Sequence, residues 1–183
     1  MPINIGVFCG SKLGQSVSYS KTTKKLANWI GENRHNIVFG GTNLGLMKVL
    51  VKEASKYDIR IYGIAPAYLI NQKKNIKYST DLIMTKNLEE RKKQFLKRAD
   101  CFVALPGGIG TLNEILDFLV KKELNEIKKK IFLINEEGFW DPFKSLITHF
   151  VNQEFLSREK IHNLIEISSL EVCLKKINKE NNA

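Results

Sequence analysis

The sequence predicts an α/β protein built on a doubly wound parallel sheet with helices on both faces. Short β-branched runs alternate with longer amphipathic segments along the chain, as in repeated strand–helix–strand units. The run Cys101–Leu105 is apolar throughout, as expected of a strand that is covered on both faces. Three glycine-containing loops each follow a predicted strand and precede a predicted helix. With right-handed crossovers, these units form a Rossmann-like sheet.

The individual elements follow from apolar periodicity and from the glycines and prolines between them. Val17–Asn33, for example, is a predicted helix because Ala27, Ile30 and their neighbours form an apolar stripe. Pro66–Tyr78 shows no such pattern and is predicted to be an irregular loop. The predicted strands are Ile3–Phe8, Ile37–Phe39, Ile59–Ile64, Leu82–Thr85, Cys101–Leu105 and Ile131–Ile134. The predicted helices are Val17–Asn33, Leu46–Tyr57, Asn87–Ala99, Thr111–Lys122, Pro142–Val151 and Leu170–Asn178.

No repeat or low-complexity linker divides the chain. Its 183 residues suit one domain, and the composition, 43% hydrophobic, excludes general disorder. We therefore expect a single Rossmann-like domain over residues 1–183, with residues 179–183 frayed at the end.

The chain is basic, with 29 Lys or Arg against 19 Asp or Glu and a formal net charge of +10. Such a charge suggests nucleic acid, a phosphorylated small molecule or a membrane surface as partner. No apolar stretch approaches the roughly 20 residues that cross a bilayer, and no recognition-helix, RNP or zinc-finger pattern occurs. Much of the excess lies in lysine pairs such as Lys24–Lys25 and Lys73–Lys74, which a solvated surface explains. We expect a small phosphorylated partner, with no nucleic acid and no membrane.

Cysteines and histidines bear on the compartment and on metal binding. The three cysteines form no Cys-x-x-Cys pair, which favours a reducing cytoplasm. The three histidines show no metal-ligand spacing and are interpreted as surface or hydrogen-bonded residues. These residues are Cys9, Cys101, Cys173, His35, His149 and His162. The N-terminal residues lack the basic and apolar regions of a signal peptide, so we expect a cytoplasmic protein with no metal.

The three glycine loops form a candidate phosphate site. Because they follow parallel strands, they lie at the carboxyl edge of the sheet, and the first and third flank the point where strand order reverses if their strands are neighbours. Glycine lets backbone N–H groups approach an anion, and a following helix N-terminus adds positive potential. The candidate binding residues here are Gly10, Ser11, Gly40, Gly41, Gly107, Gly108 and Gly110. The alternative is that these glycines only make tight turns.

Two common nucleotide motifs are absent. Asn113 stands where the third glycine of G-x-G-x-x-G belongs, and no G-K-[ST] sequence occurs. NAD or ATP bound by those routes is therefore disfavoured.

Two cations occupy an unexpected place on the predicted helix Asn87–Ala99. Its apolar stripe comprises residues 88, 91, 92, 95, 96 and 99, so Arg91 and Lys92 point toward the core or a cleft. A guanidinium and an ammonium in such a position can clamp a substrate anion. The alternative is that their aliphatic stems pack while their charged heads reach water.

Glu114 is the corresponding acidic candidate. Thr111-x-x-Glu114 matches a capping box, in which both side chains satisfy free N–H groups of a helix. The buried stripe of this helix is predicted to be Leu112, Ile115, Leu116 and Leu119, which leaves Glu114 on the opposite side. A carboxylate in the first turn beside a phosphate loop can also act as a base on water or stabilise a developing cation.

Pro106–Glu114 resembles the P-G-G-x-G-T-x-x-E motif of the Lonely Guy (LOG) family, whose members are cytokinin riboside 5′-monophosphate phosphoribohydrolases, often mislabelled lysine decarboxylases. Leu88–Lys92 is similar to that family's M-x-x-R-K segment, and the first two glycine loops match as well. The match runs in order from Ile3 to Phe155. Departures are Thr42 for a third glycine, Asn113 for the first of two acids, and the segment Lys121–Lys130; they leave the preferred base open.

The resemblance implies hydrolysis of the N-glycosidic bond of a nucleoside 5′-monophosphate to free base and ribose 5-phosphate. It implies that Arg91 and Glu114 are catalytic and that Lys92 and Thr111, with Gly107, Gly108 and Gly110, bind the nucleotide. It also implies a homodimer or larger homo-oligomer and no cofactor. A nucleotide or cofactor carrier without hydrolysis remains the alternative.

Overall fold

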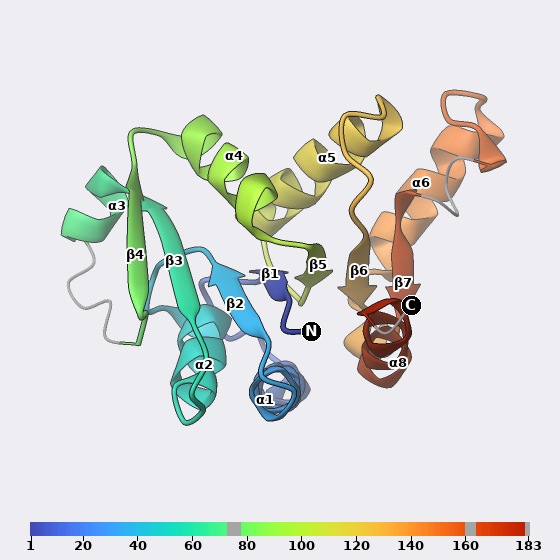
Figure 1. Cartoon of the computed structure of the whole chain (residues 1–183). Helices are drawn as coiled ribbons and strands as arrows, with labels where there is room; N and C mark the ends of the chain where they lie inside the picture. The colour runs from blue at the N-terminus through green and yellow to red at the C-terminus, as the bar shows by residue number, and fades with distance from the viewer. Residues whose placement is uncertain (73–77, 160–163, 182–183) are drawn as a thin grey trace.

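The computed structural model describes residues 1–72, 78–159 and 164–181 and shows one parallel sheet between two layers of helices (Figure 1). The sheet has seven strands in the order β4-β3-β2-β1-β5-β6-β7. The strands are β1 (Asn4–Phe8), β2 (Asn36–Phe39), β3 (Ile61–Pro66), β4 (Asp81–Thr85), β5 (Cys101–Ala104), β6 (Ile131–Ile134) and β7 (Glu166–Ser168). The helices are α1 (Val17–Glu32), α2 (Gly45–Ala54), α3 (Ala67–Gln72), α4 (Leu88–Arg98), α5 (Ile109–Glu123), α6 (Asp141–Asn152) and α8 (Leu170–Asn181), with a 3₁₀ turn η1 (Glu136–Gly138).

The order of the strands shows where along the carboxyl edge of the sheet a ligand is expected to bind. From β1 the chain winds outward through β2, β3 and β4, and then returns so that β5 pairs with the other side of β1, Ile5 opposite Cys101. The reversal therefore falls between β1 and β5, the two neighbours on which the sequence argument for a phosphate site depends. This confirms the doubly wound fold.

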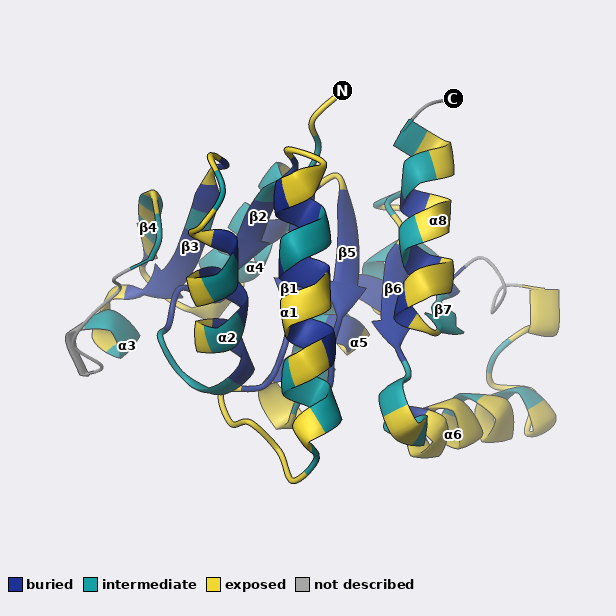
Figure 2. Cartoon of the chain, turned by 90° about the horizontal axis from the view of Figure 1, so that it is seen from below, coloured by how far each residue is buried: buried dark blue, intermediate teal, exposed yellow. Residues whose placement is uncertain are grey.

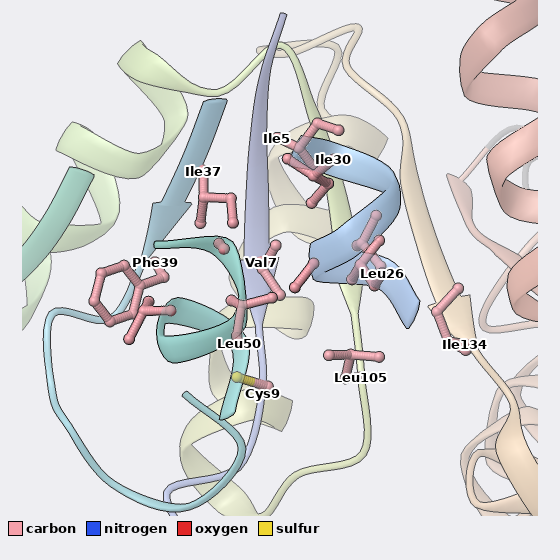
Figure 3. Packing of buried hydrophobic residues seen from close by; sticks show 14 of the residues in the cluster. Ile5, Val7, Cys9, Leu26, Ile30, Ile37, Phe39, Leu50, Leu105 and Ile134 are labelled. Carbon is pink, nitrogen blue, oxygen red and sulfur yellow. The ribbon is translucent and has the colours of Figure 1, made fainter. Parts of the chain in front are cut away.

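Two apolar clusters cover the two faces of the sheet. On one face Ile5 and Val7 of β1 pack with Leu26 and Ile30 of α1 and Leu50 of α2 (Figure 3). α1, α2 and α8 form this layer, and α4, α5 and α6 form the other (Figure 1). On the second face the cluster is built from aromatic rings, among them Phe8, Phe95, Phe102 and Phe118. Because β5 and β6 are buried on both sides (Figure 2), their side chains are apolar whichever way they point.

The structure differs from the predicted elements in three places. The predicted loop Pro66–Tyr78 contains α3, and residues 73–77 lie outside the described part. β7 was not predicted, because its three residues are only half-buried and show no apolar run. α8 continues to Asn181, past the start of the expected fraying. Its end is held by an ion pair between Glu180 and Lys130 and by Asn181 Nδ2, which donates to the carbonyl of Met1.

Candidate active site

The three glycine loops meet at the carboxyl edge of the sheet and are tied together by backbone hydrogen bonds. The N–H of Gly10, after β1, donates to the carbonyl of Pro106, after β5, at 3.0 Å. The N–H of Leu46, at the start of α2, donates to the carbonyl of Gly10 at 3.0 Å. Gly10 thus joins the first loop to both of the others.

Between these loops lies a pocket of about 470 Å³. Nine of the eleven residues predicted from sequence line it: Gly10, Ser11, Gly40, Arg91, Gly107, Gly108, Gly110, Thr111 and Glu114. Gly41 and Lys92 do not line it. The remaining wall includes residues that sequence reasoning missed, namely Lys12, Leu13, Tyr19, Thr42, Met47, Leu69, Ile109 and Phe139. Lys12, Leu13, Thr42 and Ile109 lie within the three glycine loops, although they were not named as binding residues. The others come from separate segments and share no pattern along the chain, so only the fold reveals them.

The end of α5 that faces the pocket is open to a ligand. α5 begins at Ile109 with Gly108 as its N-cap, and no side chain caps it. Thr111 is therefore inside the first turn and does not cap it, so the predicted capping box is wrong. The first-turn N–H groups of a helix have no partner within it and carry positive potential, which makes this edge suited to an anion.

Thr111 has a different role, because its hydroxyl lies over Gly107. A Cβ on Gly107 would overlap Oγ1 of Thr111 and approach the backbone N of Gly10 at 3.0 Å. Glycine at 107 is therefore needed for the close packing of the first and third loops.

Arg91 and Glu114 form an ion pair that joins α4 to α5. Nη2 of Arg91 donates to Oε1 of Glu114 at 2.7 Å, and the two side chains are only 17% and 13% exposed. The guanidinium lies 5.5 Å from the ring centre of Phe95 and beside Gly40, where a Cβ would come within 2.7 Å of Nη2. Arg91 thus points inward, as its place on the helix stripe predicts.

Burial raises the pKa of Glu114 to about 7, although Arg91 and Lys92 favour its ionised form. Burial, followed by the charge of Glu114, also raises the pKa of the thiol of Cys9, the residue after β1. Glu114 is therefore a carboxyl group that changes charge near neutral pH in the wall of a pocket, a property typical of catalytic acids and bases.

Lys92 is engaged elsewhere. Its Nζ lies 2.8 Å from Oε1 of Glu89 and 3.4 Å from Oδ1 of Asp117, and the hydrogen bond to Glu89 is the main cause that raises the pKa of Lys92. The contact between Lys92 and Asp117 is a second link between α4 and α5, in addition to the Arg91–Glu114 pair.

Two apolar residues of these helices were misplaced by the periodicity argument. Leu88 and Leu116, predicted to be buried, are 45% and 41% exposed. On α5 the buried position is taken instead by Phe118, which is 1% exposed and packs edge-on against Phe102 of β5.

The remaining polar candidates lie away from the pocket. His35 is buried and accepts a hydrogen bond from the N–H of Ile3, whereas His149 is exposed; His162 lies outside the described residues. Within the described ranges, no group of three or more His, Cys, Asp and Glu could hold a metal ion. None of the helices described is both long enough and apolar enough to cross a membrane.

Comparison with known proteins identifies the family. Residues 47–177 match a protein family described as possible lysine decarboxylase. A cytokinin riboside 5′-monophosphate phosphoribohydrolase of Arabidopsis thaliana is 29% identical over 93% of this chain and 75% of its own length. The corresponding LOG enzyme of rice, Oryza sativa subsp. japonica, is 32% identical over 85% of this chain and 64% of its own length.

Among solved structures, a molybdenum cofactor binding protein of the phototrophic bacterium Rippkaea orientalis superposes with a TM-score of 0.70 at 23% identity, over 98% of this chain and 97% of that one. This similarity concerns the fold. The family match and the two plant relatives, together with the glycine motif and the Arg91–Glu114 pair, show that the chain belongs to the LOG family.

Proposed function

We propose that the protein hydrolyses the N-glycosidic bond of a nucleoside 5′-monophosphate and releases the free base and ribose 5-phosphate. The observation that carries this proposal is the largely buried Arg91–Glu114 pair in the wall of the pocket. The uncapped N-terminus of α5 lines the same pocket. The names of the plant relatives, which act on cytokinin riboside 5′-monophosphates, support the same reaction.

The reaction places distinct demands on the two ends of the substrate. The 5′-phosphate binds at the first turn of α5, where free N–H groups and the hydroxyl of Thr111 are available. The C1′–N bond then breaks, the base leaves with the electron pair and takes up a proton, and C1′ passes through a cation-like state. A carboxylate beside C1′ stabilises that state.

Glu114 supplies this carboxylate. In its ionised form it stabilises the positive charge on C1′ and accepts a proton from the water whose oxygen bonds to C1′. Arg91 holds Glu114 in place through their 2.7 Å contact and favours its ionised form. Every step uses groups of the chain, the nucleotide and water, so the proposal includes no metal and no redox cofactor.

The test is a base-release assay on the purified protein with AMP and with an isopentenyladenine ribotide. Both free base and ribose 5-phosphate are expected from the monophosphates, whereas the nucleosides and triphosphates serve as controls. Tight binding of a nucleotide that stays intact over a long incubation would contradict the proposal and favour a carrier. The molybdenum cofactor binding protein of similar fold makes that the second candidate.

We further propose that the chain forms a homodimer or larger homo-oligomer. Leu116 and Val120 of α5 and Leu124, the C-cap residue of this helix, recur every four residues, so they share one stripe, and they are 41%, 54% and 63% exposed. A stripe of large apolar side chains in water is typical of an interface, and a second copy of the chain is the occupant that we propose for it.

We also propose that the protein is cytoplasmic. Cys9, Cys101 and Cys173 are free and buried, which favours a reducing compartment, the cytoplasm. We also propose that the partner of this basic chain is a small anion bound in the pocket and that the protein does not bind nucleic acid.

A further inference from the structure

Three cations lie near the proposed phosphate position, and their surroundings differ. Arg91 lines the pocket but pairs with Glu114 at 2.7 Å. Lys92 does not line the pocket and pairs with both Glu89 and Asp117. Lys12 lines the pocket, and no ion pair of its side chain occurs within the described residues. Of the three, Lys12 alone carries a charge that no described carboxylate neutralises.

The backbone of Lys12 is held in place although its side chain is exposed. It belongs to the loop after β1, where the carbonyl of Lys12 lies 3.2 Å from the position that a Cβ on Gly10 would take. On the other side, a Cβ on Gly45 would overlap the backbone N of Lys12, and Gly45 has a positive φ of +50°. The loops after β1 and β2 therefore touch at the backbone of Lys12, which fixes the position of this residue in the pocket wall.

The charges of the pocket lining require such a cation. Glu114 is the only Asp or Glu among the described lining residues, and Arg91 balances it. A phosphate monoester brings a charge of about −1.5 to −2 at neutral pH. The N-terminus of α5 contributes roughly half a positive charge, so a full positive charge is still needed nearby to keep the phosphate bound beside Glu114.

We propose that Lys12 is the residue that recognises the 5′-phosphate and makes the pocket select phosphorylated ribose over its unphosphorylated form. The assignment rests on the proposed function, since it takes from it the phosphate at the first turn of α5. It differs from the role that sequence resemblance gives to Lys92, whose ammonium lies outside the pocket lining between two carboxylates.

The experiment measures binding of ribose 5-phosphate and of unphosphorylated ribose to the wild-type protein and to Lys12→Met by calorimetry. The variant keeps most of the side-chain length and removes the charge. Since a hydrogen bond to a charged group contributes about 1.5–3 kcal/mol, we expect ribose 5-phosphate to bind about ten- to a hundredfold more weakly. Lys12→Arg keeps the charge and is expected to stay within a few-fold of the wild type.

Lys24→Met is the matched control, because Lys24 is an exposed residue of α1 outside the pocket and the change removes the same single charge. It is expected to bind ribose 5-phosphate as the wild type does. Equal affinity of Lys12→Met and the wild type, or an equal loss in Lys24→Met, would overturn the assignment, as would a wild type that does not discriminate the two sugars.

This readout separates the two proposals. If ribose 5-phosphate binds in a Lys12-dependent way but no nucleoside monophosphate is hydrolysed, phosphate recognition by Lys12 stands and the proposed reaction fails. If hydrolysis proceeds with Lys12→Met at an unchanged KM and kcat, the reaction stands and the role of Lys12 fails.

Discussion

In the proposed mechanism, the chemistry of the pocket depends on the charge of one carboxyl group, that of Glu114. Arg91 and Lys92 of α4 both act electrostatically on this carboxyl group. The two cations favour its ionised form, whereas burial opposes it and wins, which brings its pKa to about 7. A small change in this balance therefore changes the fraction of ionised Glu114 at physiological pH, which is the fraction that the proposed mechanism uses.

The first prediction concerns the pH dependence of turnover. If ionised Glu114 is the active form, kcat/KM for AMP rises from pH 5 to pH 9 with a midpoint near 7, because the carboxyl loses its proton over that range. Glu114→Gln is expected to lose about 10²–10⁴-fold in activity and the pH-dependent step with it. Glu32→Gln on the exposed part of α1 is the control and is expected to retain both. A Glu114→Gln variant with wild-type turnover would exclude this carboxyl from the reaction.

The second prediction follows from the second cation near Glu114. Lys92→Met removes a charge that favours ionised Glu114, so the pKa of Glu114 rises and the midpoint of the activity profile moves to higher pH. Lys93→Met, an exposed neighbour on the same helix, loses the same charge and is expected to leave the midpoint in place. Rate profiles of the three proteins from pH 5 to 9 measure this, and a shift to lower pH would contradict the electrostatic argument.

The sequence indicates Arg91 and Glu114 as functional residues but does not show that they meet. Arg91 stands out because a cation occupies an apolar stripe, and Glu114 because it follows a glycine loop. Their 2.7 Å contact spans 23 residues and depends on how α4 and α5 pack over β1. Lys12 lies in the first glycine loop, but the sequence does not single it out, because an exposed loop lysine is ordinary and only the pocket distinguishes it.

At the scale of elements, the buried strands are the most predictable part. β5 and β6 consist of fully buried residues, so their apolar runs mark them to within one residue. β7 is half-buried and three residues long, too short for a pattern to emerge. α5 begins at Ile109, two residues before its predicted start, because Gly108 and Gly110 have low helix propensity and hide the first turn in the sequence.

The third prediction tests the packing of the glycine loops against α5. Gly107→Ala places a methyl group on Thr111 Oγ1 and close to Gly10, so the loops must separate. We expect nucleotide binding to weaken at least about tenfold and the free energy of unfolding to fall by about 1–3 kcal/mol. Urea unfolding and binding of ribose 5-phosphate by the variant measure both effects.

Gly110→Ala is the control for this change. It lies in the first turn of the same helix, and a Cβ there meets no atom within 4 Å. Alanine favours a helix over glycine by up to about 1 kcal/mol, so this variant is expected to be as stable as the wild type or slightly more so. If both variants were equally destabilised, close packing at residue 107 would not be the cause.

For the whole molecule, the net charge of +10 has a limited meaning. The lysines are spread over helix surfaces. Among the described residues that line the pocket, Glu114 is the one acidic side chain. The composition points to an anion but cannot say where it binds, since that depends on strand order. In the same way, the exposed stripe on α5 cannot be recognised from sequence, because the apolar periodicity places Leu116 on the buried side.

The fourth prediction concerns this stripe on α5 and the assembly of the whole chain. If a second copy covers Leu116, Val120 and Leu124, then Val120→Glu places a charge in an apolar interface, where an unpaired carboxylate is strongly disfavoured. Sedimentation is expected to show an oligomer for the wild type and a monomer for the variant. Val172→Glu makes the same change at an exposed valine of α8 and is expected to leave the oligomer intact. A wild type that sediments as a monomer at all concentrations would contradict the proposed oligomer. Dissociation by both variants would show that the added charge, and not its place on this stripe, separates the copies.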